Sequence, residues 1–476
     1  MPPPGTLPES PRQFTVGTLT YTLPGLAALM AWLLWGDFCF HFMETVLPSV
    51  LPLKLKNYNA PNWLIGLFLT TIPAVMNATV CPVVSYWSDR HRGPRGRRIP
   101  FILYTIPFLC LFLLLVGLTP LIASDLVRRG WVTSEQMPAL LMLGLFTMGF
   151  QFFNMFVSSI YYYLFNDVVP RELLGRFLSA FRFVGVVASA FFAWFVFPKA
   201  QTHFTEIFIG TALLYGVVFT MMCLRVKEGQ YPEPVALDKN GAVRDGIKRF
   251  FLESFSSRFY WYFYLFVALW SAAGTIAVFN VFFAQSIGIN LEQLGKFYTG
   301  FLIVSAVLLI PFGFLADKLH PLRTIRIAAT LMVVAAPLPL VFLLGWVPAE
   351  SSFPIWCLVY GITAPIMALF TASELPTYMK ILPRLQYGQF SAATALVRSL
   401  ANTLGGFLGG AFIDFLTVLN RDPAFAYRYI PIWVIFFQAL ATVALWKLYA
   451  EWKRRGGWQA ETLAETQAAN QELNPL

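Results

Sequence analysis

Twelve apolar runs, each long enough to cross a lipid bilayer, constrain this chain more than any other feature of its sequence. A membrane-spanning helix needs about 20 mostly apolar residues, because every backbone N–H and C=O must be bonded internally where water is absent. The chain is 57% hydrophobic and only 12% charged, whereas soluble domains carry about 25% charged residues. We therefore expect an all-α polytopic membrane protein of twelve transmembrane helices. The predicted spans are 25–50, 63–87, 100–123, 138–165, 177–198, 204–224, 259–286, 293–315, 325–346, 353–378, 389–416 and 430–450.

The distribution of Lys and Arg predicts how these helices are oriented. With both termini in the cytoplasm, eight of the 34 Lys and Arg residues fall outside and the other 26 fall inside. Lys and Arg are retained on the cytoplasmic side during insertion. We therefore expect a multi-pass protein of a cell's inner or plasma membrane with N- and C-termini in the cytoplasm. The net charge of +10 is then a topological signal, and we expect no nucleic-acid partner.

The longest link between spans divides the chain into two sets of six. We expect a cytoplasmic N-terminal tail at 1–24, an N-terminal six-helix bundle at 25–224, a central cytoplasmic loop at 225–258, a C-terminal six-helix bundle at 259–450 and a cytoplasmic C-terminal tail at 451–476. The stretch AVRDGIKRFFLESF within the loop places its large apolar residues near one face. That pattern suits a helix on the inner membrane surface, with a solvated linker helix as the alternative.

The two halves repeat each other. PRELLGRF at 170–177 matches PRLQYGQF at 383–390, and each precedes the fifth span of its half. SDRHRGPRGRR after the second span has a weaker counterpart in ADKLHPLRTIR after the eighth, each beginning with an acid at a helix end. Two six-helix halves that repeat in this way are typical of a transporter that rocks one half against the other.

The loop after the second span carries a recognisable motif, Asp-Arg-x-Arg-x-x-Arg-Gly-Arg-Arg-x-Pro. With the six-plus-six arrangement and the long central loop, it resembles the major facilitator superfamily over residues 25–450. Within that superfamily the motif is most similar to the sucrose-type and glycoside-pentoside-hexuronide cation symporters. The resemblance implies two pseudo-symmetric six-helix bundles and transport by alternating access. The motif residues are Asp89, Arg90, Arg92, Arg95, Gly96, Arg97, Arg98 and Pro100.

The resemblance also implies that this loop acts as a latch, in which Asp89 meets a helix of the other half and bonds neighbouring arginines. By the internal repeat, Asp317 is the corresponding acid of the second half. A simpler function is topological, because the arginines alone hold the loop in the cytoplasm. The predicted latch residues are Asp89, Arg90, Gly96, Arg97, Arg98, Asp167, Arg176, Asp317 and Glu374.

The first span holds three titratable residues on one stripe. Asp37, His41 and Glu44 are spaced i, i+4 and i+7, which at 100° per residue places them within about a 60° arc. Asp37 lies about 16 Å into the span at 1.5 Å per residue, near the midplane. An intramembrane acid is functional by default, and an acid beside a histidine can pass a proton. The alternative is a structural hydrogen-bond network.

Polar stripes on other spans predict where a solute binds. The fourth span carries Gln151, Asn154, Ser158 and Tyr161 at spacings of three, four and three residues. In the superfamily, spans 1, 4, 7 and 10 line the central cavity, so the resemblance turns these stripes toward the substrate. Single polar residues are otherwise helix-to-helix hydrogen bonds, and Arg182 can instead snorkel to the interface. The further candidates are Arg182, Trp270, Asn280, Thr371, Arg398 and Asn402.

These features together predict a secondary active transporter of a small polar solute, a sugar or glycoside, coupled to protons. The sodium-using melibiose branch of the resembled family has acids within helix 2, whereas residues 63–87 here contain none. Without such carboxylate oxygens a sodium site is harder to build, so proton coupling is favoured over sodium. The alternatives are an exporter of amphipathic compounds and a membrane solute sensor that does not transport. No hydrolase, metalloprotease or P-loop motif occurs, so we expect no enzyme, cofactor or metal. The expected partners are the solute, the proton and the bilayer, without an obligate protein partner.

Overall fold

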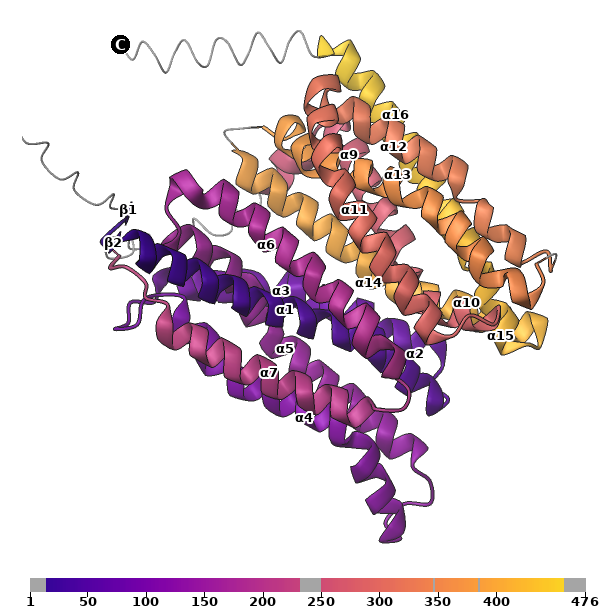
Figure 1. Ribbon diagram of the computed structural model, residues 1–476. Coiled ribbons are helices and arrows are strands. Elements are labelled where there is room, and N and C mark those ends of the chain that lie inside the picture. Colours follow the sequence, from indigo (N-terminus) through magenta and orange to yellow (C-terminus); the bar gives the residue numbers. More distant parts are fainter. Residues whose placement is uncertain (1–13, 232–249, 346, 384–385, 458–476) are drawn as a thin grey trace, which may run out of the picture. The chain divides into compact units, whose positions relative to one another are not determined.

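The computed structural model describes residues 14–231, 250–345, 347–383 and 386–457 (Figure 1). Twelve helical segments of the described residues are long and apolar enough to cross a membrane, and each overlaps one predicted span. The prediction of an all-α polytopic membrane protein is confirmed. The predicted tails extend into 1–13 and 458–476, and most of the predicted interfacial helix falls in 232–249; these stretches lie outside the described residues.

The spans are assembled from α-helices and from shorter 3-10 or π-helical turns, labelled η. The first six are α1 (Leu23–Asn57); α2 (Asn62–Gly66), η1 (Leu67–Thr71) and α3 (Ile72–Arg90); α4 (Ile99–Arg128); α5 (Gln136–Val168); α6 (Arg171–Phe191), η2 (Phe192–Val196) and η3 (Phe197–Lys199); and α7 (Phe204–Arg225). The last six are α9 (Arg258–Gly274), η4 (Thr275–Phe279) and α10 (Asn280–Ser286); α11 (Leu291–Leu319); α12 (Pro321–Ala335) and η5 (Leu338–Phe342); η6 (Ala349–Ser351) and α13 (Ser352–Ile381); α14 (Tyr387–Asn420); and α15 (Pro423–Ala426), η8 (Tyr427–Tyr429) and α16 (Ile430–Arg454).

Several spans are interrupted, and local sequence explains two of the breaks. Span 7 changes from α-helix to 3-10 helix after Gly274, which weakens a helix because it has no side chain to restrict its backbone. Span 9 gives way to η5 at Pro337, which cannot donate a main-chain hydrogen bond. The π-helical turn η1 interrupts span 2. Such turns leave main-chain groups to be satisfied by neighbours and are common at functional sites.

The N-terminal tail contains a β-hairpin that the helical pattern did not predict. Strands β1 (Phe14–Val16) and β2 (Leu19–Tyr21) pair antiparallel, with Phe14 opposite Tyr21. Gly17 at the turn has a φ of +55°, a conformation that costs glycine little. The hydroxyl oxygen of Thr18 accepts a hydrogen bond from the main-chain N–H of Gln230 at 2.8 Å. The hairpin is therefore tied to the beginning of the central loop.

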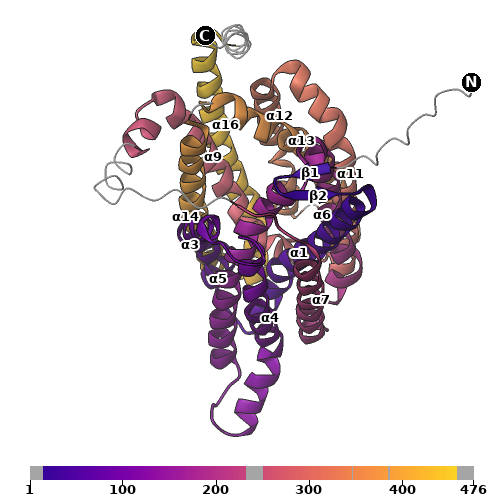
Figure 2. The same ribbon diagram turned by 90° about the vertical axis from the view of Figure 1, so that its left-hand side faces the viewer.

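The chain forms two compact units. Unit 1 consists of Met1–Val50, Thr79–Phe192 and Ala200–Ala236, and unit 2 consists of Leu51–Ala78, Ala193–Lys199 and Leu237–Leu476. Within unit 1, α4 packs along both α5 and α7 (Figure 1), and α4 and α5 form a long antiparallel pair (Figure 2). Within unit 2, α14 packs against α2, η1 and α9. Unit 2 therefore contains two stretches, 51–78 and 193–199, that precede the central loop.

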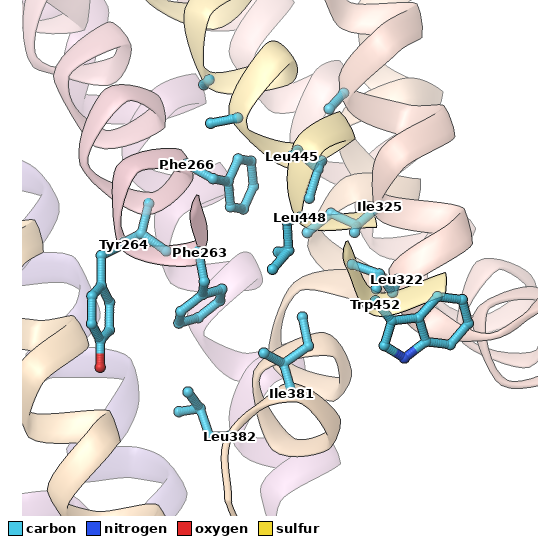
Figure 3. Packing of buried hydrophobic residues seen from close by; sticks show 14 of the residues in the cluster. Phe263, Tyr264, Phe266, Leu322, Ile325, Ile381, Leu382, Leu445, Leu448 and Trp452 are labelled. Atoms are coloured by element: carbon cyan, nitrogen blue, oxygen red, sulfur yellow. The ribbon is translucent and has the colours of Figure 1, made fainter. Parts of the chain in front are cut away.

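Unit 2 has a continuous apolar core where α9, α12, α13 and α16 meet. Phe263 and Phe266 of α9 lie against Leu445 and Leu448 of α16, all at most 1% exposed (Figure 3). Side chains at i, i+3 and i+7 share one helix face, so Phe263, Phe266 and Trp270 project from the same side of α9. This core holds the α9 face that carries Trp270, a predicted solute contact.

Candidate functional site

The titratable stripe of α1 is built within unit 1, and its deepest member is Asp37. The side chain of Asp37 is 0% exposed, and neither carboxylate oxygen accepts a hydrogen bond from a described residue. The Nε2 atom of His41, one turn later, lies 3.4 Å from Oδ1 of Asp37. Burying an unpaired carboxylate costs several kcal/mol or more, far more than burying the neutral acid. The structure thus places a buried acid and an imidazole in contact.

His41 has room beside Asp37 because the facing residue of α6 is a glycine. A Cβ at Gly185 would come within 2.7 Å of the His41 ring, too close for an ordinary contact. The Phe181 ring, one turn earlier on α6, meets the imidazole edge-on at 5.6 Å between centroids. One turn beyond His41, the Thr45 and Ser189 hydroxyls are 3.4 Å apart. Sequence reasoning missed Gly185, and the only available signal was a glycine within an apolar span.

Glu44 joins the stripe on α1 to the polar stripe on α5. The amide of Asn154 donates a hydrogen bond to Oε1 of Glu44 at 2.5 Å, while Oδ1 of Asn154 is buried without a partner among the described residues. Asn154 is 3% exposed, whereas the Glu44 side chain is exposed. Of the flanking residues on α5, Gln151 is 9% exposed and Ser158 is partly buried. The predicted proton and solute residues are therefore in direct contact.

Two predicted solute residues of unit 1 lie apart from this contact. Tyr161 is completely buried, and its hydroxyl donates to the main-chain oxygen of Leu33 at 2.7 Å. That bond fixes α5 to α1 and occupies the phenolic donor. Arg182 on α6 is exposed and makes no ion pair with a described residue. It does not pair with the acids of the first span.

The basic loop after α3 is organised around two acids. Arg97 makes a two-point contact with Asp167 of α5, Nε to Oδ2 at 2.9 Å and Nη2 to Oδ1 at 2.6 Å. Arg98, only 5% exposed, bonds Asp167 at 3.2 Å and Asp89 at 2.5 Å, and also the Ser88 hydroxyl. Paired guanidinium and carboxylate groups are directional and strong. The hydrogen bonds that Arg97 donates to Asp167 raise the pKa of Arg97 above its ordinary value. The predicted bond from Asp89 to a neighbouring arginine is present.

A residue that the sequence did not single out completes this loop. The Glu228 carboxylate accepts hydrogen bonds from the main-chain N–H groups of Arg97, Arg98 and Ile99 at 2.9, 2.8 and 2.5 Å. These groups begin α4, where N–H groups lack helical partners and the dipole favours an anion. Gly96 has a φ of +97°, and a Cβ there would collide with Glu228. We name the set Asp89, Arg97, Arg98, Asp167 and Glu228 the loop cluster.

The loop cluster also binds the beginning of the central loop. The hydroxyl of Tyr231 donates to Oε2 of Glu228 at 3.3 Å, and its ring lies 4.1 Å from the guanidinium carbon of Arg97. Burial first, and then the carboxylates of Asp167 and Glu228, raise the pKa of Tyr231 well above its ordinary value. The phenol therefore stays protonated and able to donate. No spacing rule connects Glu228 and Tyr231 to residues 130 positions earlier, so pattern alone could not find them.

The remaining predicted latch residues make fewer contacts. The guanidinium of Arg90 lies over the ring of Tyr86 at 4.1 Å, and Arg176 is exposed on α6. Asp317 is exposed near the end of α11 and forms no ion pair with a described residue. The basic residue Arg326 of the same repeat lies 3.8 Å from the ring centre of Tyr449. The two repeats therefore share a sequence pattern but not the same side-chain contacts.

In unit 2, Glu374, Tyr378 and Arg398 form one polar cluster. Nη2 of Arg398 on α14 donates to Oε1 of Glu374 and to the hydroxyl of Tyr378, both on α13 and both at 2.9 Å. Tyr378 in turn donates to Glu374 at 2.7 Å. Nε of Arg398 is buried without a partner among the described residues. Glu374, which we predicted as a latch residue, is therefore bonded to Arg398, which we predicted as a solute-binding residue. We name Glu374, Tyr378 and Arg398 the arginine cluster.

The other predicted solute residues of unit 2 lie on α9, α10, α13 and α14. Trp270 stacks on Phe370 with 4.1 Å between ring centres and 10° between planes. Asn280 is the first residue of α10, directly after the 3-10 turn that interrupts span 7. Thr371 is exposed next to Phe370, and Asn402 is partly buried one turn after Arg398. Interrupted helices are where transporters expose main-chain groups to a ligand.

A second cluster in unit 2 joins residues from before and after the central loop. Asp414 of α14 accepts hydrogen bonds from the main-chain N–H groups of Asn62 and Trp63 at 3.0 and 2.8 Å, and from the Asn62 amide at 2.8 Å. The Asn62 side-chain oxygen accepts from Tyr427 at 2.7 Å and from Lys56 at 3.5 Å. We name Lys56, Asn62, Asp414 and Tyr427 the Asp414 cluster.

Glycines allow α14 to approach α2 closely enough for this cluster. A Cβ at Gly410 would collide with the main chain of Asn62, and one at Gly66 would collide with the main chain of Gly406. The Thr71 hydroxyl donates to the Thr403 carbonyl at 2.7 Å, one turn further along. The sequence does contain the signal for this contact, GGFLGG at 405–410. Small residues spaced by four are typical of close helix packing in membranes.

Known proteins agree with this architecture. The sequence model of the family described as MFS/sugar transport protein matches residues 20–279. A bacterial homologue of the human lysosomal transporter Spinster is 13% identical with a TM-score of 0.66, covering 90% of this chain and 99% of its own. The nucleoside transporter NupG is also 13% identical with a TM-score of 0.66, at 89% and 100% coverage. A D-xylose-proton symporter is 12% identical with a TM-score of 0.59, at 89% and 97% coverage. No curated protein sequence matches the chain.

Proposed function

Because the chain belongs to the MFS/sugar transport protein family, a family of integral multi-pass membrane transporters, we propose that it moves a sugar or glycoside together with protons by alternating access. The structural relatives include transporters for nucleosides and for D-xylose with protons. At 12–13% identity they support the fold alone, so the proposed solute and coupling ion rest on this chain's own residues. We also propose the inner or plasma membrane as its location, with both termini in the cytoplasm, from the Lys and Arg distribution.

The observation that carries proton coupling is the environment of Asp37. Its carboxyl group is fully buried with no hydrogen-bond donor, and the one basic group within 4 Å among the described residues is the His41 imidazole. Such a carboxyl is stable when it holds a proton and costly when it is ionised without a partner. Exchange of a proton at Asp37 therefore changes the free energy of this part of unit 1 considerably. A transporter needs such a change to link a proton to a conformation.

Glu44 connects that proton site to the solute. Its contact with Asn154 means that a solute hydroxyl competing for either group also changes the surroundings of the carboxylate. Oδ1 of Asn154 is buried without a partner among the described residues, and we propose that a solute hydroxyl donates to it. We place Gln151, Asn154 and Ser158 in the solute site, with Arg182 as an exposed donor further along. Tyr161 is left out of the proposed site because its hydroxyl already donates to Leu33.

Unit 2 carries polar and aromatic groups of its own that suit a sugar. One face of Trp270 is covered by Phe370, and its opposite face can pack against the apolar C–H face of a pyranose ring. Arg398 presents a guanidinium whose Nε has no partner among the described residues, and a planar fork of donors suits paired hydroxyls. Asn280, Thr371 and Asn402 provide further polar groups. Glu374 orients Arg398 rather than contacting the solute itself.

We propose that the loop cluster and the Asp414 cluster stabilise particular conformations of the protein and do not bind the solute. With both termini inside, the loop cluster lies at the inner face and the Asp414 cluster at the outer ends of α2 and α14. The Asp414 cluster joins residues from the two halves of the sequence, so it must open whenever those halves part at the outer face. We therefore propose that it is a lock of the outward-closed state. Arg90, Arg176 and Asp317 remain proposed latch residues by resemblance.

Uptake into proteoliposomes tests this proposal directly. Purified protein is supplied with a proton gradient, a sodium gradient or neither, and with radiolabelled monosaccharides, disaccharides, nucleosides and amino acids. Uphill accumulation of a sugar that follows the proton gradient supports the proposal, whereas accumulation that follows only sodium contradicts the coupling. A protein that binds solute without accumulating it in any gradient is a sensor.

Two variants test whether Asp37 carries the coupled proton. Asp37→Asn removes the ionisable group with little change of shape, and should abolish uphill accumulation while leaving solute exchange across the membrane intact. Asp125→Asn is the matched control, because Asp125 is a partly exposed acid near the end of α4 whose one ion pair among the described residues is with Arg129, at 2.6 Å. If Asp37→Asn still concentrates solute as the wild type does, Asp37 is not the carrier.

A further inference from the structure

An apolar groove runs between α12 and α16 on unit 2. Its volume is about 440 Å³, within the range of about 300–1,000 Å³ that is usual for small-molecule sites. Val333 of α12 forms one wall, and Ala439, Thr442, Val443 and Trp446 of α16 form the other. Val443 and Trp446 are about half exposed, at 52% and 48%. The lining is mostly apolar and faces outward, so an acyl chain of the membrane is the ligand that suits it.

Two cations lie at one end of this groove. Lys447 is exposed and is the charged member of the lining. The guanidinium carbon of Arg326 on α12 lies 4.5 Å from the ring centre of Trp446 and 3.8 Å from that of Tyr449. Trp446 is itself held in place, since its Nε1 donates to the Thr330 hydroxyl at 3.1 Å. The aromatic faces thus orient Arg326 while leaving its N–H groups available.

No acid neutralises this pair among the described residues. Neither Arg326 nor Lys447 forms an ion pair there, and the nearby Glu451 lies 3.7 Å from Arg454 and 3.5 Å from Arg455 instead. Arg326 is in the second turn of α12, and Lys447 is two turns before the end of α16. In the proposed topology both ends are cytoplasmic, the leaflet face where anionic lipids concentrate.

We infer that this groove binds an anionic phospholipid, with one acyl chain between α12 and α16 and the phosphate between Lys447 and Arg326. The charge of the site selects the headgroup, because Lys and Arg at the cytoplasmic membrane surface attract anionic lipids. The groove selects a lipid over a soluble phosphate ester, because only the lipid fills the apolar part. The inference rests on the proposed topology and not on the transported solute.

Native mass spectrometry of the full chain, purified in detergent and titrated with phosphatidylglycerol or phosphatidylcholine, tests the site. The wild type should retain phosphatidylglycerol preferentially, and Arg326→Gln with Lys447→Gln should lower its retention by at least about fivefold. Arg171→Gln with Lys227→Gln removes two exposed cations elsewhere and should change retention little. Equal retention of both lipids by the wild type, or an equal loss in the control variant, would overturn the inference.

A second variant separates the groove from a general attraction to positive charge. Val443→Trp fills the groove from its exposed wall and keeps both cations, so it should expel the lipid as effectively as the double charge variant. Unchanged thermal unfolding of each variant in lipid-free detergent shows that it is folded. If Val443→Trp keeps its lipid, if inorganic phosphate displaces the lipid, or if the groove is occupied by a second copy seen as a dimer mass, the inference is wrong.

Discussion

The carboxylate of Asp414 accepts hydrogen bonds from the main-chain N–H groups of Asn62 and Trp63, about 350 positions earlier in the chain. It satisfies the first turn of α2, whose N-terminal N–H groups have no helical partner. The α14 helix that carries Asp414 and the α2 helix that it caps come from opposite sides of the central loop. Asp414 thereby links the formation of the short helix α2 to the position of α14.

Asp414→Asn should weaken this coupling. The asparagine keeps the shape but loses the charge and one acceptor, which costs about 1–3 kcal/mol for a charged group bonded to N–H donors. The population in which α2 and α14 are apart should increase correspondingly. Spin labels at Asn57 and Val418, both exposed, in a chain without its native cysteines, report this as a longer component in the distance distribution.

The control for that measurement is Asp422→Asn. Asp422 also caps a short helix, accepting from the main-chain N–H groups of Ala424 and Phe425 of α15, whereas the cap that Asp414 provides is on α2. An identical distance change in both variants would show that loss of any cap, and not separation of α2 from α14, produces the signal.

Gly185→Ala should displace His41 from Asp37. The added methyl group overlaps the imidazole, and overpacking of this kind costs about 1–3 kcal/mol. We expect lower proton-driven accumulation and an altered pH dependence of uptake. Gly210→Ala on α7 is the matched control, since a Cβ there meets nothing within 4 Å. In a His41→Ala background the Gly185→Ala change should have little further effect; a full effect there contradicts the prediction.

Glu228→Gln should destabilise the N-terminus of α4. Loss of a charged cap costs about 1 kcal/mol, and here three N–H groups share the carboxylate. The measurement is the midpoint of thermal unfolding in detergent, compared with Glu172→Gln, which removes an exposed acid from the first turn of α6. Equal midpoints for the two variants would mean that Glu228 contributes no more than an exposed helix-end charge.

Arg398→Lys should impair solute affinity more than insertion. Lysine keeps the charge but loses the planar guanidinium, whose Nη2 donates to both Glu374 and Tyr378. Hydrogen bonds to charged groups contribute about 1.5–3 kcal/mol, so we expect the apparent KM for uptake to rise about tenfold or more. The double variant with Tyr378→Phe should be less than additive. Arg129→Lys, at the ion pair with Asp125, should leave the KM unchanged; additive effects of the two changes would argue against one cluster.

Sequence alone predicted the features that depend on local chemistry. All twelve spans follow from the requirement that a backbone in lipid bonds internally, and each is present among the described residues. The stripe of Asp37, His41 and Glu44 also follows from helical spacing, and the structure places His41 beside Asp37. Helical periodicity determines which residues share a face, so no tertiary information was needed for these.

Only the tertiary structure decided which faces meet. Glu228 is bonded to Arg98 across 130 positions and Asp414 to Asn62 across 352, and no local spacing encodes such pairs. Glu374 and Arg398, which the sequence assigned to different tasks, became one cluster because α13 and α14 bring them within 2.9 Å. Gly185 is important only because the His41 imidazole packs against it, leaving no room for a side chain. The physical reason is the same in each case: spacing determines the direction of a side chain on its own helix, whereas its partner depends on how separate helices pack.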